Sequence, residues 1–344
     1  MSFYSLGYAG RFAPYKVPSH EQNVSPRQLT KTDTVEPPYS AFNVQPQRVR
    51  GFYRVANMQW PLDDLHWPMG KVVRNMASML EMAASAPPIA SCAAPVVLLT
   101  TGALNPIHRG HVSMIHIAAE YLRSNVATVG LWPVGGFVSP SHDLYLAQKF
   151  AASRSVGSGS GAATYFPSHL RIAMAELACR EDALVSTGTW ETCVPTRWPD
   201  FPEVCGELER TLERMRARGL LATLPQVWYV CGDDHAAKCG LSEAGGRGVS
   251  PTVGVLCVAR GQDAATSPSS MLTTRGSRFL RVATTADIRE TSSSLVRKLL
   301  EAASQAATPA ARSAALDALH VILHADVAVF LLSRMPGATS SRVA

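Results

Sequence analysis

Two histidines, His108 and His111, lie where an apolar run of the chain ends in a turn containing glycine and proline. The run at residues 96–101 is continuous and β-branched, as in a strand buried on both faces, and a helical pattern restarts at Gly110. A strand, a tight turn and a helix N-terminus present backbone N–H groups and the positive end of a helix dipole. We therefore expect an anion site with two imidazoles at its mouth.

A second helix start of this kind lies near the other end of the chain. Ser292, Ser293 and Ser294 precede a helical pattern, and Arg297 follows about one turn later. Ordinary N-capping needs only one of the three serines, whereas an arginine one turn along adds a planar fork for phosphate oxygens. Two such helix starts that face each other would bind one triphosphate between them.

Composition narrows the class of partner. The 344-residue chain has 47% hydrophobic residues and a net charge of +6, which suits a phosphate-rich small substrate. Dense Lys/Arg blocks and apolar runs of membrane-spanning length are absent, so we expect neither a nucleic-acid nor a membrane partner. The seven cysteines form no Cys-x-x-Cys pair, which indicates reduced thiols rather than a metal site of the protein. We expect a cytoplasmic homo-oligomer, with the nucleus or the mitochondrion as alternative locations.

The chain divides by composition near residue 90. Residues 1–90 are rich in Pro, Ser, Asn and Gln, and only residues 69–84 have helical periodicity, so we predict a partly ordered N-terminal extension. Deleting residues 1–85 is expected to leave the chemistry largely intact. Residues 91–344 form the predicted catalytic domain, which contains a long loop at 134–165 and, within it, a flexible Gly/Ser insert at 153–163.

Strands alternate with helices in this domain. The pattern predicts an α/β fold with a Rossmann-like open parallel sheet, helices on both faces, and ligands at the carboxyl ends of the strands. A helical subdomain closes the chain. Strands are predicted at residues 96–101, 127–133, 184–190, 226–231, 252–259 and 279–283, and helices at 110–124, 167–179, 203–218, 292–303, 309–323 and 325–332.

Two signatures identify a family. The segment Gly102-Ala-Leu-Asn-Pro-Ile-His-Arg-Gly-His111 resembles the Gly-x-x-Asn-Pro-x-(His/Thr)-x-x-His signature of nucleotidyltransferases, and residues 290–297 are similar to their Ile-Ser-Ser-Thr-x-x-Arg signature. The blocks at 136–145, 170–177, 190–191, 231–234 and 323–332 look like successive blocks of eukaryotic nicotinamide/nicotinic acid mononucleotide adenylyltransferases, in the same order. The resemblance covers about residues 95–334.

The resemblance implies adenylyl transfer from ATP, with Mg²⁺, to nicotinamide mononucleotide and possibly nicotinic acid mononucleotide, by in-line attack without a covalent intermediate. The attacking phosphate is already anionic, so catalysis consists of positioning and charge neutralisation. The implied catalytic residues are His108, His111 and Arg297. The implied ATP-binding residues are these three with Gly102, Ala103, Gly232, Asp234, Ser292, Ser293 and Ser294. The implied mononucleotide-binding residues are Leu104, Asn105, Ser139, Lys149, Arg171, Trp190, whose indole would stack on the pyridine ring, and Glu191.

The chain departs from the family pattern in three respects, one of which is the Gly/Ser insert at 153–163 that lengthens the loop. Leu146-Ala147-Gln148 replaces a lysine-rich stretch and leaves Lys149 displaced by one position, and residues 236–248 lack the Asn-Leu-Trp segment that normally follows Gly-x-Asp. The alternatives are a nucleotidyltransferase acting on phosphopantetheine or flavin mononucleotide, and a non-catalytic binding or chaperone-like homologue. A class I aminoacyl-tRNA synthetase shares the His-x-Gly-His element, but no Lys-Met-Ser-Lys-Ser loop is present.

Overall fold

The central strand of the protein is β3 (Ala94–Gly102), and its apolar run is buried on both faces as predicted. Val96 and Leu98 lie in one hydrophobic core, and Val97 and Leu99 lie in the other. The structure is a computed structural model that describes residues 54–55, 58–59, 66–85, 93–154, 165–242, 249–259, 270–272, 278–283 and 291–334. All of these belong to the second of two compact units, Met1–Gly51 and Phe52–Ala344.

Seven strands form the main sheet. Their order is β5 (Val185–Thr187), β4 (Leu131–Pro140), β3, β6 (Gln226–Gly232), β7 (Gly254–Ala259), β9 (Arg278–Ala283) and β8 (Ser270–Leu272). All neighbours are parallel except β8, which is antiparallel to β9 and was not predicted. Counted along the chain from β3 and without β8, the spatial order is 3-2-1-4-5-6, which is the doubly wound order of dinucleotide-binding sheets. The predicted Rossmann-like fold is confirmed.

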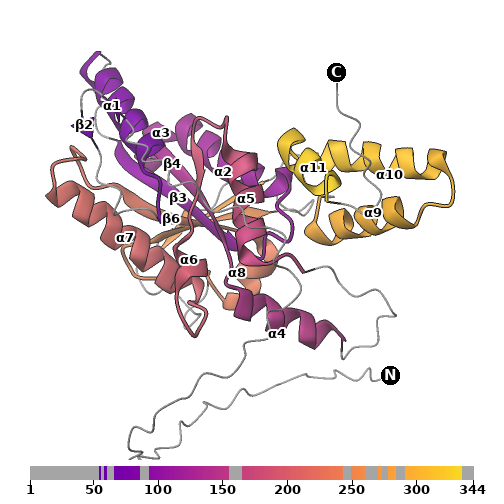
Figure 1. Ribbon diagram of the computed structural model, residues 1–344. Helices are drawn as coiled ribbons and strands as arrows, with labels where there is room; N and C mark the ends of the chain where they lie inside the picture. The colour runs from indigo at the N-terminus through magenta and orange to yellow at the C-terminus, as the bar shows by residue number, and fades with distance from the viewer. Residues whose placement is uncertain are drawn as a thin grey trace, which may run out of the picture. The chain divides into compact units, whose positions relative to one another are not determined.

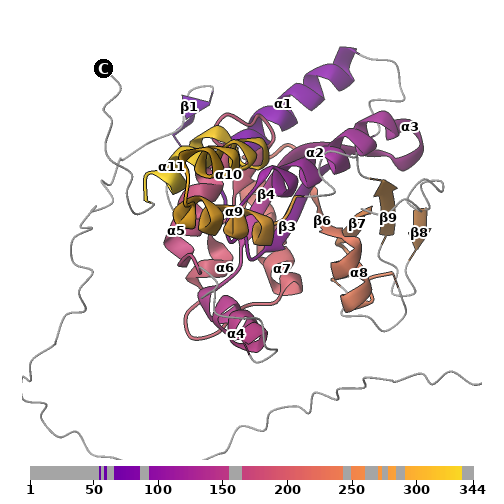
Figure 2. The same cartoon turned by 90° about the vertical axis from the view of Figure 1, so that its right-hand side faces the viewer.

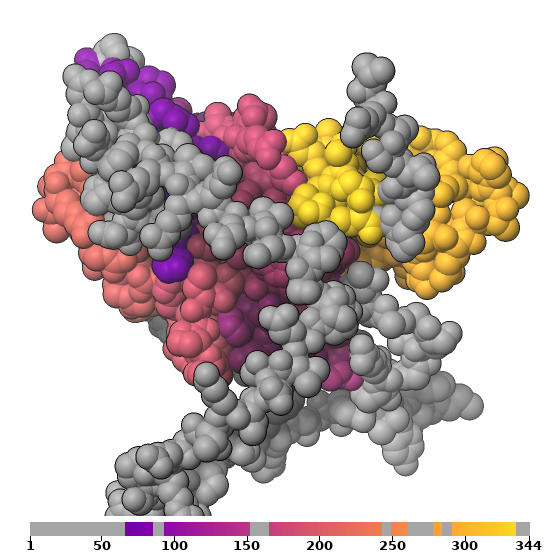
Figure 3. Space-filling view, viewed as in Figure 1, coloured from indigo at the N-terminus to yellow at the C-terminus, as the bar shows by residue number. Residues whose placement is uncertain are grey.

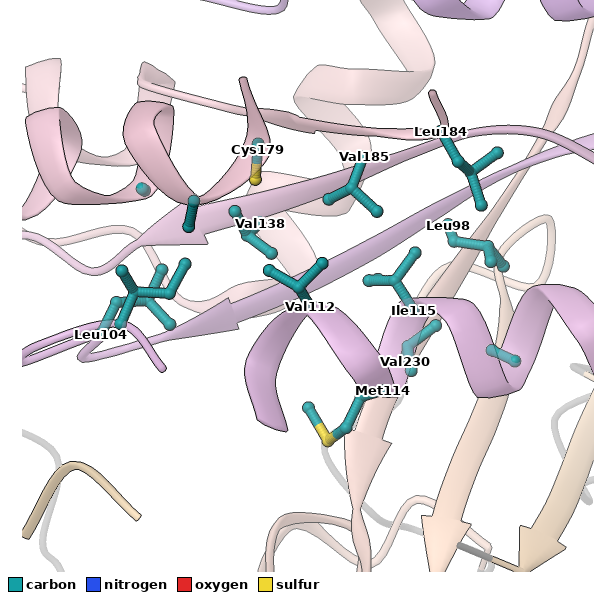
Figure 4. Close-up of a cluster of buried hydrophobic side chains, with 14 of the residues drawn as sticks. Leu98, Leu104, Val112, Met114, Ile115, Val138, Cys179, Leu184, Val185 and Val230 are labelled. Carbon is teal, nitrogen blue, oxygen red and sulfur yellow. The ribbon is translucent and has the colours of Figure 1, made fainter. Parts of the chain in front are cut away.

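Helices cover both faces of this sheet (Figures 1 and 2). The core on one face includes residues of α2 (Arg109–Ser124) and α5 (Ser168–Cys179). Figure 4 shows Val112 and Ile115 of α2 beside Leu98, Val138 and Val185 of three neighbouring strands. The core on the other face includes residues of α1 (Gly70–Ser85) and α7 (Phe201–Ala217).

Three helices complete the C-terminal part of the described chain: α9 (Ser293–Gln305), α10 (Pro309–Ile322) and α11 (Ala325–Leu332). Helix α10 packs on α9, and α11 packs on α5, so the yellow helices of Figure 3 lie against the magenta part of the surface. Thr308 caps α10 by accepting a hydrogen bond from the backbone N–H of Ala311, with Pro309 in the first turn. The predicted helical subdomain is confirmed.

The strand predicted at 127–133 begins later, at Leu131. Helix α3 (Val126–Val129) occupies its first part and ends at Gly130 in the left-handed conformation. Strand β4 then continues to Pro140, and α4 (Asp143–Arg154) follows, where the sequence predicted one long loop. The cause is a pair of glycines inside β4: a Cβ on Gly136 would lie 2.6 Å from Ile115 of α2. Glycine there permits close helix packing and does not mark a turn.

Other boundaries also differ from the predictions. Strand β5 is shorter than predicted, and a single helical turn, α6 (Trp190–Cys193), follows it. A short helix, α8 (Asp233–Cys239), begins directly after β6. Ser153 and Arg154 end α4, and the remainder of the predicted Gly/Ser insert lies outside the described residues. Within the described part of the chain, no helix has the length and apolarity needed to span a bilayer.

The helical periodicity at 69–84 corresponds to α1, and this helix packs on the sheet. Val72, Met76 and Met79 are buried in the second core, and the indole of Trp67 contacts the ring of Phe137 edge-on, with centroids 5.1 Å apart. Residues before it contribute a two-stranded antiparallel pair, β1 (Arg54–Val55) and β2 (Met58–Gln59). The domain boundary near residue 90 stays a prediction.

Candidate active site

The candidate site lies at the topological switch point of the sheet, between β3 and β6. These strands are parallel neighbours, and from them the strand order proceeds in opposite directions. In open α/β sheets, ligands bind in the crevice outside the carboxyl ends of the strands at such a point. Gly102 ends β3 and Gly232 ends β6, so the two glycine-containing turns singled out in the sequence lie beside this crevice. The hydroxyls of Thr101 and Tyr229 are hydrogen-bonded across the two strands at 3.0 Å.

The turn after β3 is buried and held from several directions. Leu104 has a positive φ of 43° and is 1% exposed, and Asn105 is completely buried. A left-handed backbone at a branched residue persists only where the surroundings hold it in place. The backbone N–H of Phe166 donates to Oδ1 of Asn105 at 2.9 Å. Both residues therefore shape the turn, whereas a direct contact with the mononucleotide stays a prediction.

The two histidine rings lie against each other at the start of α2, with their planes tilted by 42°. Their ring centroids are 3.8 Å apart, His108 is 2% exposed, and His111 is half-buried. The backbone N–H of His108 donates to Nδ1 of His111 at 3.2 Å. Because Nδ1 accepts this bond, the proton of the neutral His111 imidazole lies on Nε2, which makes Nε2 a hydrogen-bond donor. This arrangement suits His111 as a donor to phosphate oxygens.

The start of α9 contacts the same turn, as the two signatures predicted. Ser293 donates from Oγ to the carbonyl of Pro106 at 2.9 Å, and Arg297 donates from Nη1 to the carbonyl of Asn105 at 2.6 Å. These bonds bring the two helix N-termini together. Burial lowers the pKa of Arg297, which is half-buried. Two of its five guanidinium N–H groups donate to the Asn105 carbonyl and to the Ser294 hydroxyl.

The three serines have different roles. Ser292 is the N-cap of α9, where its hydroxyl accepts a hydrogen bond from the backbone N–H of Leu295 at 3.1 Å. Ser293 binds the Pro106 carbonyl, and Ser294 Oγ accepts from Nη2 of Arg297 at 3.0 Å. Ordinary capping thus accounts for one serine, and the other two fix the turn and the arginine. Their contacts with ATP stay a prediction.

Gly110 explains how closely the two segments approach each other. A Cβ at this position would collide with Oγ1 of Thr291 and lie 3.0 Å from Cε1 of His108. No other residue type fits without displacing one of these groups. Thr291, which precedes the N-cap of α9, therefore packs directly on the first turn of α2.

Arg171 is a fully buried residue of α5 whose side chain bonds to three segments around the site. It donates to the carbonyl of Ala103 at 3.0 Å, to the carbonyl of Phe166 at 2.9 Å, and to the carboxylate of Asp143 at 2.7 Å. These bonds connect α5, the turn after β3 and the start of α4. The geometry thus gives Arg171 a positioning role. Hydrogen bonds from Ser168 and Arg171 keep the pKa of Asp143 below its usual value, against the effect of burial.

Ser139 and Glu191 form a buried pair beside Trp190. Ser139 Oγ donates to Oε2 of Glu191 at 3.0 Å, and Glu191 is 4% exposed. Burial raises the pKa of Glu191 to about 8, and the hydroxyls of Ser139 and Ser141 oppose this rise. Trp190 begins α6 and is partly buried against the second core. Stacking on a pyridine ring would require one face of its indole to be open to the substrate.

Residues after β6 follow the carboxyl end of the strand next to β3. Gly232 is the N-cap of α8, and Asp234 is exposed. The adjacent Asp233 has a structural environment: its Oδ1 accepts from Sγ of Cys257 at 3.3 Å and lies 3.4 Å from the Arg281 guanidinium. Asp233 is thus engaged within the protein, whereas Asp234 is exposed. That Asp234 binds the nucleotide ribose stays a prediction.

Lys149 lies on α4 with its ammonium 5.9 Å from the centroid of the Tyr145 ring. Burial lowers the pKa of Lys149, and the charges of Lys238 and Arg297 lower it further. Lys238 was not singled out in the sequence. Lys238 lies four residues after Asp234, which places the two side chains on one helix face. This spacing is informative only once residues 233–239 are known to be helical.

Comparisons with known proteins agree with the motifs. No family model matches the chain. A nicotinamide/nicotinic acid mononucleotide adenylyltransferase 2 of Danio rerio is 31% identical over 121 residues, which are 35% of this chain and 33% of that protein. The protein of the same name from Rattus norvegicus is 30% identical over 121 residues, covering 35% of this chain and 32% of its own length. The match therefore spans about a third of these curated relatives.

Two solved structures also align with the chain. Plasmodium falciparum nicotinic acid mononucleotide adenylyltransferase complexed with APC gives a TM-score of 0.41 at 8% identity, covering 70% of this chain and 95% of that chain. The same enzyme complexed with NaAD gives a TM-score of 0.37 at 10% identity, with the same coverage. The fold itself rests on the strand order described above. In sequence, the chain is similar to the nicotinamide/nicotinic acid mononucleotide adenylyltransferases, the family that its motifs indicated.

Proposed function

We propose that the chain transfers the adenylyl group of ATP to nicotinamide mononucleotide or nicotinic acid mononucleotide. A phosphate oxygen of the mononucleotide attacks the α-phosphorus of ATP, the bond from that phosphorus to the bridging oxygen breaks, and pyrophosphate leaves. The observation that carries the proposal is the pair of bonds from Ser293 and Arg297 to the carbonyls of Pro106 and Asn105. These bonds bring together the N-termini of α2 and α9, whose backbone N–H groups would bind the phosphates from two sides.

The chain would act by positioning and by stabilising charge. The attacking phosphate is already anionic, so no group need remove a proton from it. Nε2–H of His111 and the remaining N–H groups of Arg297 would donate to phosphate oxygens as charge moves towards the leaving pyrophosphate. Donors held in place before the reaction need no reorganisation during it, which is the main source of their effect on rate.

Magnesium would enter with the triphosphate as part of the substrate. Within the described ranges, no group of three or more His, Cys, Asp or Glu side chains could hold a metal ion. Mg²⁺ keeps several waters and is commonly bound through substrate phosphates. When bound, the ion would neutralise phosphate charge. Residues of this chain would then only have to bind the complex of nucleotide and ion.

The pyridine substrate is favoured by the Trp190–Glu191 pair. Trp190 is partly exposed next to the buried carboxyl of Glu191, and a cationic pyridinium over an indole face is stabilised by about 1–2 kcal/mol when water is excluded. A flat, neutral flavin gains no such electrostatic attraction, and phosphopantetheine has no ring. We therefore propose a pyridine mononucleotide as the second substrate.

The test is a substrate panel with the purified full-length chain. ATP and Mg²⁺ are supplied with nicotinamide mononucleotide, nicotinic acid mononucleotide, flavin mononucleotide or phosphopantetheine, and both the dinucleotide and pyrophosphate are measured. We expect product with one or both pyridine nucleotides, in equal amounts with pyrophosphate. Product with only flavin mononucleotide or phosphopantetheine would contradict the assignment of the substrate. No product with any of the four would contradict the assignment of adenylyl transfer itself.

A further inference from the structure

The crevice between β3 and β6 opens where the hydrogen-bonded ladder of the two strands stops. Their register pairs end at Leu99 and Tyr229. Beyond this point residues 100–102 pair with β4, and residues 230–232 pair with β7. The ends of β3 and β6, which both lie in the described part of the chain, are therefore not paired with each other as strands. Their separation depends on side-chain contacts rather than on backbone pairing.

A chain of side-chain hydrogen bonds crosses this opening. The hydroxyls of Thr101 and Tyr229 are 3.0 Å apart, and the Tyr229 hydroxyl lies 3.2 Å from Nε2 of His235. Thr101 directly precedes Gly102 at the end of β3, and His235 directly follows Asp234 in the first turn of α8. These three side chains, which we call the crevice bridge, therefore connect the turn after β3 with the start of α8.

The middle of the crevice bridge is held by aromatic packing. The Tyr229 ring is stacked on Phe201, the first residue of α7, with centroids 4.8 Å apart and planes inclined by 23°. The His235 ring meets the same Phe201 edge-on at 5.0 Å. Tyr229 is 1% exposed, and burial raises its pKa, so the hydroxyl keeps its proton. A buried hydroxyl with partners on both sides is a stiff connection between them.

The two segments that the crevice bridge connects carry groups proposed to bind opposite parts of one nucleotide. The turn after β3 leads into α2, whose N-terminus would bind phosphate oxygens. The first turn of α8 carries the exposed Asp234, which would bind the ribose. A ligand that contacts two segments at once binds more tightly when their separation is already correct, because less order has to be imposed on binding.

We propose that Tyr229 and His235 are positioning residues for ATP, which hold the start of α8 at the distance from the turn after β3 that one bound nucleotide requires. The inference rests on the proposed function for the identity of that nucleotide. Neither side chain need touch the nucleotide for this role. A ligand that contacts only the phosphate-binding turn should not sense the crevice bridge, whereas ATP should.

The test compares two probes on the full chain, ATP with Mg²⁺ and pyrophosphate with Mg²⁺, each titrated calorimetrically without a mononucleotide. Tyr229→Phe keeps the ring that packs on Phe201 and removes the hydroxyl. We expect this variant to bind ATP about tenfold more weakly, the size of effect of a lost internal hydrogen bond. Its affinity for pyrophosphate should change by less than about twofold. General loosening of the fold would weaken both probes alike, so the split between them is specific to positioning.

The matched control is Tyr121→Phe, the same chemical change at a partly buried tyrosine of α2. It should leave the binding of both probes unchanged. His235→Leu should weaken ATP binding as Tyr229→Phe does, because it removes the partner of the Tyr229 hydroxyl. His235→Gln should restore most of the affinity, since a glutamine side chain carries its terminal amide at about the position of Nε2. The melting temperature of each variant shows that the chain is folded.

The outcomes separate this inference from the proposed function. Selective loss of ATP binding in Tyr229→Phe, in a chain whose wild type performs no adenylyl transfer, would support the crevice bridge and contradict the enzyme. In an active wild type, the same variant should raise the KM for ATP about tenfold and leave the KM for the mononucleotide unchanged. Equal ATP affinity in wild type and Tyr229→Phe, or equal losses for ATP and pyrophosphate, would overturn the positioning role.

Discussion

The hydroxyl of Ser293 donates a hydrogen bond of 2.9 Å to the carbonyl of Pro106, and so joins two segments that are 187 residues apart in the chain. Arg297 repeats the connection through the carbonyl of Asn105. Each helix start alone is a common structural feature with no implied chemistry. Joined by these bonds, they present imidazole, hydroxyl, guanidinium and backbone donors to one volume, and the first two predictions concern that junction.

Arg297→Lys should reduce adenylyl transfer although it keeps the charge. A lysine cannot bond the Asn105 carbonyl and donate a planar fork to phosphate at the same time. We expect kcat to fall about tenfold to a hundredfold, as for one lost donor in the transition state. Steady-state kinetics with ATP and each pyridine mononucleotide measure this, with the exposed Lys298→Gln on the same helix as the control. A variant as fast as wild type would restrict Arg297 to a structural role.

His111→Ala should lower kcat by about a hundredfold or more, because it removes a donor that the backbone of His108 holds in the required tautomer. The matched control is His320→Ala, a histidine exposed on α10. Circular dichroism and the melting temperature of both variants show whether the fold is intact. If a folded His111→Ala chain retains the wild-type rate, then His111 takes no part in the reaction.

Glu191→Gln should change how stability depends on pH. The pKa of Glu191 in the folded protein, about 8, lies above the ordinary value of 4.5, so its protonated form favours the folded state. That contribution is complete below about pH 4.5 and is lost as the pH rises through about 8. The melting temperature of the wild type should therefore decline across this range, and the decline should be smaller in Glu191→Gln. Glu301→Gln, at an exposed position of α9, should leave it unchanged.

The prediction that residues 1–85 are dispensable needs revision, since α1 and Trp67 are part of the second core. Trp67 also packs on Gly188, where a Cβ would collide with its ring, and the backbone N–H of Thr189 donates to the His66 carbonyl at 2.9 Å. These contacts fix the backbone just before Trp190.

We expect deletion of residues 1–51, the first compact unit, to leave the melting temperature and activity close to those of the full chain. Deletion of residues 1–85 should lower both.

Trp67→Ala should destabilise the protein by about 3–5 kcal/mol, as for large aromatic truncations in a core. Chemical denaturation measures the free energy of unfolding of each variant relative to the full chain. Equal stability of the proteins that lack residues 1–51 and residues 1–85 would show that α1 contributes little.

The sequence predicted those parts of the protein in which local pattern and tertiary role coincide. The run in β3 is buried on both faces, so its composition alone identifies a central strand. The errors occur where a residue serves a neighbour that is distant in the chain. Gly136 was interpreted as part of a loop, although it lies inside β4 so that Ile115 can approach. Local pattern contains no trace of that contact.

The candidate site shows the same division. Both signatures and the histidine pair follow from motif and helix-start chemistry, which are local. The role of Arg171 does not, because its partners Ala103 and Asp143 come from two other segments. A motif places such an arginine near the substrate, whereas the structure shows a fully buried side chain that holds the surrounding elements together.

The connection between α4 and α5 has a consequence for how this chain can vary. Just before α5, the backbone N–H of Phe166 donates to the side chain of Asn105 in the turn after β3. At the start of α5, the backbone N–H of Ser168 donates to the carboxylate of Asp143, the first residue of α4, at 3.0 Å. The anchors on both sides are thus joined to each other, whatever sequence runs between them. Closing a longer loop costs only slightly more free energy than closing a shorter one. A reporter peptide inserted between α4 and α5 should therefore leave Asp143, Phe166 and Ser168, and with them the proposed site, in place.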